Sequence, residues 1–88
     1  TVDPAEHDRM VAMTSHFPAF LSSLLQSTAL SSPPVYRGPG FRSMTRLAST
    51  PHALLRTFLQ SNRANILRNA TKLQRELDRW IKQNKGQN

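Results

Sequence analysis

The first third of the chain carries one apolar stripe with helical spacing. Eight apolar residues recur at steps of three or four: Met10, Val11, Met13, Phe17, Phe20, Leu21, Leu24 and Leu25. This spacing predicts an amphipathic helix that runs to about Leu30. Asp3 and Pro4 fit its N-cap and first position, and Glu6 fits the last residue of a capping box. Pro18 cannot donate a hydrogen bond to the carbonyl of Thr14, so we expect a kink or break near residues 14–17.

The middle of the chain changes character. Ser31 to Gly40 holds three of the six prolines and two of the three glycines, which is typical of a loop. Phe41 to Ala48 fits a short helical segment. Thr50 and Pro51 then fit the N-cap and first position of another helix.

The C-terminal half again has helical periodicity. Its first apolar face consists of Leu54, Leu55, Phe58 and Leu59, and its second of Ile66, Leu67, Ala70, Leu73, Leu77, Trp80 and Ile81. A basic stripe occupies the other side of the second segment: Arg68, Lys72, Arg75, Arg79 and Lys82. No strand alternation is present. The pattern predicts an all-α chain with a kinked long helix, a Pro/Gly loop, a short helical segment and a C-terminal helical hairpin or bent helix.

Length limits what this fold can bury. The 88 residues without cysteine suit one small domain that has neither disulfides nor thiolate metal sites. Because so much apolar surface lies on so few helices, dimerisation or docking is favoured over a monomeric three-helix domain, which stays open as the alternative.

The charge balance leaves several classes of partner open. Twelve Lys and Arg stand against five Asp and Glu, a net charge of +7, which suits nucleic acid, an acidic membrane surface or an anionic small molecule. No apolar run could span a bilayer, and the start "TVDPAEHDRM" is acidic where a signal peptide is basic. We therefore expect a cytoplasmic protein without membrane association. The start lacks methionine, so the chain is expected to belong to a longer one.

Two residues are candidates for binding chemistry. His16 lies on or beside the apolar stripe, where a core-edge histidine bonded to a carbonyl is the commoner case. Alternatively, the disturbance at Pro18 presents its imidazole to an anionic ligand. Arg46 follows Gly38 and Gly40, which would allow a tight turn or a close ligand approach, and its planar guanidinium suits a carboxylate. An exposed arginine without a ligand is the plainer reading.

Other chemistry is sparse. His7 and His52 lie near predicted helix starts, where we expect them to be solvated, and no residues have metal-ligand spacing. The sequence contains no GxGxxG, no P-loop and no nucleophile elbow. A complete enzyme within these residues is therefore not expected.

Three stretches occur in an order that is more specific than any one of them. "VDPAEHDRMVAMTSHFP", "GFRSMTRLAS" and "LLRTFLQSNRANIL" together resemble the C-terminal helical domain of the prephenate/arogenate dehydrogenase family, over Val2 to about Ile81. The resemblance implies an intertwined homodimer with a fold like the C-terminal domain of 6-phosphogluconate dehydrogenase. It also implies a Rossmann domain, outside these residues, that binds NAD or NADP and carries the catalytic histidine. The substrate would be prephenate or arogenate, decarboxylated oxidatively in tyrosine biosynthesis.

The resemblance also assigns roles to individual residues. His16 matches the histidine of the family's serine-histidine-x-proline step, and Arg46 matches the arginine that binds a substrate carboxylate. Ser15, Gly40 and Thr45 match neighbouring positions that shape the pocket. No catalytic residue, cofactor site or metal site is implied within this chain. Ala19, Ser43 and Leu55 depart from the family pattern, which often has a histidine, an acid and a tryptophan at these three positions.

Two further hypotheses remain. In one, the chain is a small basic helical module that binds nucleic acid or an acidic partner through the basic stripe on residues 68–82. No helix-turn-helix glycine and no aromatic stacking platform support it. In the other, the chain is purely a dimerisation domain in which His16 and Arg46 are inert.

Overall fold

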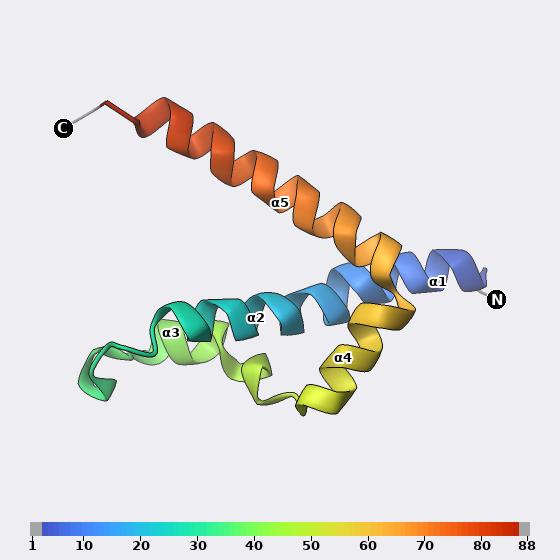
Figure 1. Ribbon diagram of the computed structural model, residues 1–88, viewed down its shortest axis with the longest axis horizontal. Coiled ribbons are helices and arrows are strands. Elements are labelled where there is room, and N and C mark those ends of the chain that lie inside the picture. Colours follow the sequence, from blue (N-terminus) through green and yellow to red (C-terminus); the bar gives the residue numbers. More distant parts are fainter. Residues whose placement is uncertain (1–2, 87–88) are drawn as a thin grey trace.

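The computed structural model describes residues 3–86, and all regular secondary structure in that range is helical (Figure 1). The elements in chain order are α1 (Pro4–Val11), the π-helical turn η1 (Ala12–His16), α2 (Phe17–Thr28), the 3₁₀ turn η2 (Pro34–Tyr36), α3 (Pro39–Met44), the 3₁₀ turn η3 (Arg46–Ser49), α4 (His52–Ser61) and α5 (Arg63–Asn84). The predicted all-α class is confirmed, and the bent C-terminal half is the pair α4 and α5.

The N-terminal helix begins as its sequence predicts. A carboxylate oxygen of Asp3 accepts a hydrogen bond from the backbone N–H of Glu6 at 3.2 Å, and Pro4 occupies the first turn. An aspartate at this position satisfies a free N–H group and opposes the positive end of the helix dipole.

Pro18 changes the winding of the helix and does not end it. The backbone N–H of Phe17 donates to the carbonyl of Ala12, five residues back, so η1 is one wide turn between α1 and α2. These three elements follow nearly one line in Figure 1. A disturbance near residues 14–17 is thus confirmed, but it is a π turn where a kink or break was expected. The wider turn accommodates a ring that lacks an N–H and crowds the carbonyl of Thr14.

Arg37 holds the loop that follows α2. Its Nη2 donates to the carbonyls of Ala29, Leu30 and Ser32 at 3.3, 3.3 and 2.7 Å, and its Nε donates to Oγ of Ser32 at 3.3 Å. Carbonyls just past a helix C-terminus have no partner within the helix and attract positive charge. One guanidinium therefore closes the loop through which the chain reverses direction.

After the loop the chain returns along α2. α3 begins at Pro39, two residues earlier than Phe41, and it is followed by η3, which packs against α2. Oγ of Ser22 on α2 donates to the carbonyl of Met44 at 2.8 Å. This bond holds the returning segment in place beside α2.

The predicted start of α4 is wrong by one residue. Pro51, with a ψ of 137°, occupies the cap position, and no side-chain hydrogen bond caps the helix. Oγ1 of Thr50 donates instead to the carbonyl of Leu47 at 2.7 Å. The threonine hydroxyl thus closes the preceding 3₁₀ turn, and it is not available to the first N–H groups of α4.

The core lies where η1 meets α4 and α5. Its buried apolar residues are Ala12, Ala19, Leu55 and Ile66, and within residues 3–86 no large side chain is fully buried. α5 leaves this corner and points away from α2, and residues 74–86 are all exposed (Figure 1). The radius of gyration is 15.5 Å, against about 12 Å for a compact domain of this length. The fold is therefore open, and most of the apolar stripe of α5 has no intrachain partner.

Replacing Arg37 with alanine is expected to destabilise the chain. Four hydrogen bonds from a charged donor would be lost, so the free energy of unfolding should fall by about 1–3 kcal/mol. Thermal unfolding at one fixed protein concentration measures this. Arg56→Ala, on an exposed face of α4, is the control and should change stability little. Equal stability of the two variants would contradict this role for Arg37.

Candidate functional site

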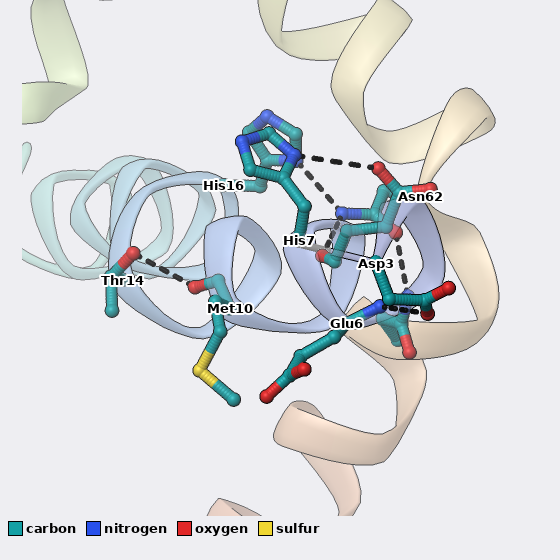
Figure 2. Close-up of polar contacts among 9 residues, drawn as sticks. Asp3, Glu6, His7, Met10, Thr14, His16 and Asn62 are labelled. Atoms are coloured by element: carbon teal, nitrogen blue, oxygen red, sulfur yellow. Dashed lines mark hydrogen bonds and ion pairs between the residues drawn. The ribbon is translucent and has the colours of Figure 1, made fainter. Parts of the chain in front are cut away.

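His16 is held by elements from both halves of the chain. It is the last residue of η1, and its ring stacks on Phe58 of α4, with centroids 4.1 Å apart and planes 15° apart. Its Nδ1 lies 3.2 Å from Nδ2 of Asn62, the residue between α4 and α5 (Figure 2). The ring is half-buried. The structure therefore shows a histidine with one edge bonded to a side-chain amide, where the plainer sequence reading expected a backbone carbonyl.

Asn62 was not identified as a site residue from the sequence, although it lies in the stretch "LLRTFLQSNRANIL" that contributes to the family resemblance. It is 8% exposed, and its Nδ2 also donates to the carbonyl of Asp8 at 2.8 Å. Its Oδ1 accepts a hydrogen bond from Nδ2 of Asn65, also at 2.8 Å. The sequence did offer one signal for Asn62, which is a polar residue between two apolar helical faces. A buried amide at such a place needs several hydrogen-bond partners and therefore organises the residues around it.

Burial lowers the pKa of His16 below its ordinary value of 6.5, and the nearby carboxylate of Asp8 acts in the opposite direction. Desolvation disfavours the imidazolium, which needs water or an anion to stabilise its charge. The larger of the two effects is burial, so the native fold favours a neutral ring.

Arg46 lies at the start of η3 and lines a groove of about 180 Å³ against α2. The other residues of this groove are Pro18, Leu21, Ser22, Leu25, Ser43, Met44 and Leu47. The Arg46 side chain is exposed and makes no hydrogen bond or ion pair within the described residues. The groove includes Pro18, two residues beyond His16. Arg46 belongs to η3 and His16 to η1; His16 does not line this groove, and no described hydrogen bond joins the two residues.

The neighbouring predicted residues differ in what they do. Oγ1 of Thr45 is used within its own segment, where it donates to the carbonyl of Phe41 at 2.8 Å, and the residue is buried. Ser15 is exposed on η1. A side chain added at Gly40 would meet no atom within 4 Å, and among the described residues only Gly86 has a positive φ. A tight turn therefore does not explain Gly38 or Gly40.

The three departures from the family pattern occupy different surroundings. Ala19 and Leu55 are buried in the core, and Ser43 lies with Arg46 in the groove beside α2. A serine carries no charge, so the guanidinium has no acidic neighbour there. An unpaired guanidinium in an apolar groove suits a ligand that brings its own carboxylate.

A second groove, of about 250 Å³, lies between the N-terminal helix and α5. Its lining residues are Arg9, Met10, Met13, Asn65, Arg68, Asn69 and Lys72. Nδ2 of Asn69 is buried there without a hydrogen-bond partner. His7 and His52 lie elsewhere and are exposed, and the described residues contain no group of three or more potential metal ligands. None of the helices in the described range has the length and apolarity needed to cross a bilayer.

The structure is a helical domain with an unpaired arginine in a groove against α2 and a half-buried histidine held by α4 and Asn62. Residues 3–88 match the family described as prephenate dehydrogenase, dimerization domain, and the chain belongs to that family. It is also similar to a prephenate dehydrogenase of Bacillus subtilis (strain 168), with 30% identity over 96 aligned positions. That alignment covers 99% of this chain and 26% of the relative, so the chain spans about a quarter of the length of that protein.

Acidification is expected to destabilise the chain through His16. Because its native pKa lies below 6.5, the unfolded state binds the proton more readily. The stabilisation is complete above the unfolded pKa and is lost as pH falls from there through the native pKa. Chemical unfolding between about pH 8 and pH 5 tests this. His16→Phe should flatten the dependence and His52→Gln should retain it; an unchanged slope in His16→Phe would contradict the assignment.

Proposed function

We propose that the chain is the C-terminal, substrate-binding and dimerising domain of a prephenate or arogenate dehydrogenase. The observation that carries the proposal is the unpaired guanidinium of Arg46 in a groove against α2 that includes Pro18. Membership in the dimerization-domain family supports it. In this proposal a Rossmann domain precedes the chain in the full protein and completes the active site.

Arg46 is proposed to bind a carboxylate of the substrate. Prephenate carries two carboxylates, and a guanidinium offers one of them two parallel N–H donors. The side chain has no competing acid within the described residues. A substrate bound there is proposed to extend along the groove past Pro18 and to reach His16, outside the groove lining, as a second polar contact. His16 is thus proposed to orient the substrate, and the catalytic histidine is assigned to the preceding domain.

The cofactor is proposed to lie outside this chain. A dinucleotide fold needs a strand followed by a glycine-rich turn, and residues 3–86 contain no strand. NAD or NADP, bound by the preceding domain, would accept hydride in the oxidative decarboxylation. The residues of this chain bind the substrate, orient it and exclude water from one side of the site.

The apolar stripe of α5 is proposed to form a homodimer interface. Leu67, Leu77, Trp80 and Ile81 are 56, 53, 63 and 47% exposed in the single chain. The open shape leaves this surface without a partner, and the family description names dimerization. Met10 and Met13 are also exposed, and the unsatisfied amide of Asn69 lies beside them. A second copy would cover these groups, with the intertwined arrangement expected from the family.

The basic-module hypothesis has less support. Its stripe on α5 is exposed, and Arg79 already pairs with Glu76 at 3.0 Å. No groove in the described residues brings the whole stripe together. Family membership favours the dehydrogenase proposal, and the basic stripe is interpreted as a solvated face.

Arg46→Ala in the full protein is expected to raise KM for prephenate or arogenate by roughly 10- to 100-fold, with a much smaller change in kcat. One charge-assisted contact would be lost, and it is made equally in the ground and transition states. Steady-state kinetics with NAD and NADP measure this. Arg42→Ala, on the exposed part of α3, is the matched control. An unchanged KM in Arg46→Ala would contradict the carboxylate role.

Leu77→Asp is expected to weaken the dimer. A carboxylate placed in the apolar stripe would have to lose its hydration on association, which is costly without a partner. Sedimentation of the full protein over a range of concentrations should show dissociation at higher concentration than for the unchanged protein. Arg75→Asp introduces the same side chain on the opposite face of α5. Equal behaviour of the two variants would place the interface elsewhere.

A further inference from the structure

We infer that Asn62 is a positioning residue that holds His16 neutral, with its proton on Nε2, so that His16 can only donate a hydrogen bond to a substrate oxygen. The assignment of the tautomer depends on contacts within this chain. The identity of the oxygen as one of an anionic substrate rests on the proposed function.

The direction of every hydrogen bond around Asn62 follows from two neighbouring groups, one of which can only donate and the other only accept. Nη1 of Arg68 lies 3.2 Å from Oδ1 of Asn65, and a guanidinium can only donate. Nδ2 of Asn65 is therefore the donor to Oδ1 of Asn62. On the other side, the carbonyl of Asp8 can only accept, so Nδ2 of Asn62 is the atom facing it. The guanidinium on one side and the carbonyl on the other therefore require the same orientation of the Asn62 amide.

That orientation leaves His16 one role at Nδ1. Nδ2 of Asn62 has two hydrogens, one for the carbonyl of Asp8 and one for Nδ1 of His16. An Nδ1 that accepts this bond carries no proton, so a neutral ring carries its proton on Nε2. A protonated ring would place an N–H against the N–H of the amide. The amide thus disfavours the imidazolium together with burial, which lowers the pKa of His16.

The surroundings of the ring do not reverse this preference. Phe58 of α4 covers one face and Asn62 the Nδ1 edge, and neither side chain titrates. Asp8 of α1 is the charged group whose field raises the pKa of His16, and its effect is the smaller one. No described residue hydrogen bonds to Nε2, which lies on the ring edge away from Nδ1 (Figure 2). The free Nε2–H group is therefore suited to donate to a carboxylate, carbonyl or hydroxyl oxygen.

Arg46 and His16 would then make two different kinds of contact with the substrate. Arg46 supplies a positive charge for a carboxylate, whereas His16 supplies a neutral donor with a fixed direction. A histidine in this tautomer cannot take a proton from the substrate at Nε2, because that nitrogen is already protonated. Asn62 thereby keeps His16 from acting as a competing base beside a substrate that must lose its proton elsewhere.

The test is NMR of the full protein with ¹⁵N-labelled histidine rings, in the absence of substrate. His16→Gln identifies the His16 signals. At about pH 8 we expect Nδ1 at the chemical shift of an unprotonated nitrogen and Nε2 at that of a protonated one. A signal with the proton on Nδ1, or an average of both tautomers, would overturn the inference. This measurement needs no variant of Asn62, so it decides even where such a variant does not fold.

Asn62→Asp provides the second measurement. It replaces the NH₂ group with an oxygen of the same shape that accepts and carries charge, so we expect the proton on Nδ1 and a raised pKa of His16. At a pH above that raised pKa, where the ring is neutral, KM for prephenate should rise about tenfold through the lost Nε2 donor, with little change in kcat. Asn84→Asp makes the same change at the end of α5, where Nδ2 of Asn84 donates to the carbonyl of Trp80, and it is the control.

The outcomes separate the inference from the proposed function. Turnover of prephenate or arogenate together with an Nδ1 proton on His16 would overturn the inference and leave the dehydrogenase proposal intact. An Nε2 proton in a protein that turns over neither compound would overturn the proposed function and leave the tautomer assignment standing. A folded Asn62→Asp protein in which His16 keeps both its tautomer and its pKa would contradict the role of Asn62.

Discussion

The buried amide of Asn62 connects the two halves of the chain. It joins the corner between α4 and α5 to the carbonyl of Asp8, 54 residues away in the chain, and to the ring of His16. The apolar core around it is small, since Ala12 and Ala19 contribute little volume. Leaving the buried amide of Asn62 without hydrogen bonds would cost much free energy. Its bonds therefore define where the N-terminal helix meets α4 and α5. The same contact determines how the histidine is presented.

The elements that follow from local chemistry could be predicted from the sequence. Asp3 and Pro4 define the helix start because capping depends on neighbouring residues alone. Helical periodicity identified both apolar faces, and Pro18 identified the disturbance before α2. Its form as a π turn was not predictable, because a sharp kink and a wide turn both relieve the crowding around a proline. The cap of α4 was not predictable for a similar reason. The hydroxyl of Thr50 could bond either to the N–H groups of α4 or to a carbonyl of the preceding turn, and in the structure it bonds to the carbonyl.

The site could be predicted only in part, because its geometry depends on contacts between distant segments. His16 and Arg46 were identified from the family pattern and from their setting beside Pro18 and the glycines. The stack on Phe58 and the bond to Asn62 join residues 42 and 46 positions apart, which no spacing rule connects. The open arrangement of α5 has the same origin. Its stripe predicted burial, but only the folded chain shows that residues 74–86 are all exposed.

The proposed function requires one anionic substrate to contact both Arg46 and His16. A crystal structure of the full protein with bound prephenate, or with a stable dicarboxylate analogue, would show whether it does. We expect one ligand carboxylate within hydrogen-bond distance of the Arg46 guanidinium and a second ligand oxygen facing Nε2 of His16. A ligand bound away from the groove between η3 and α2, with Arg46 turned to solvent, would refute the proposed roles of both residues.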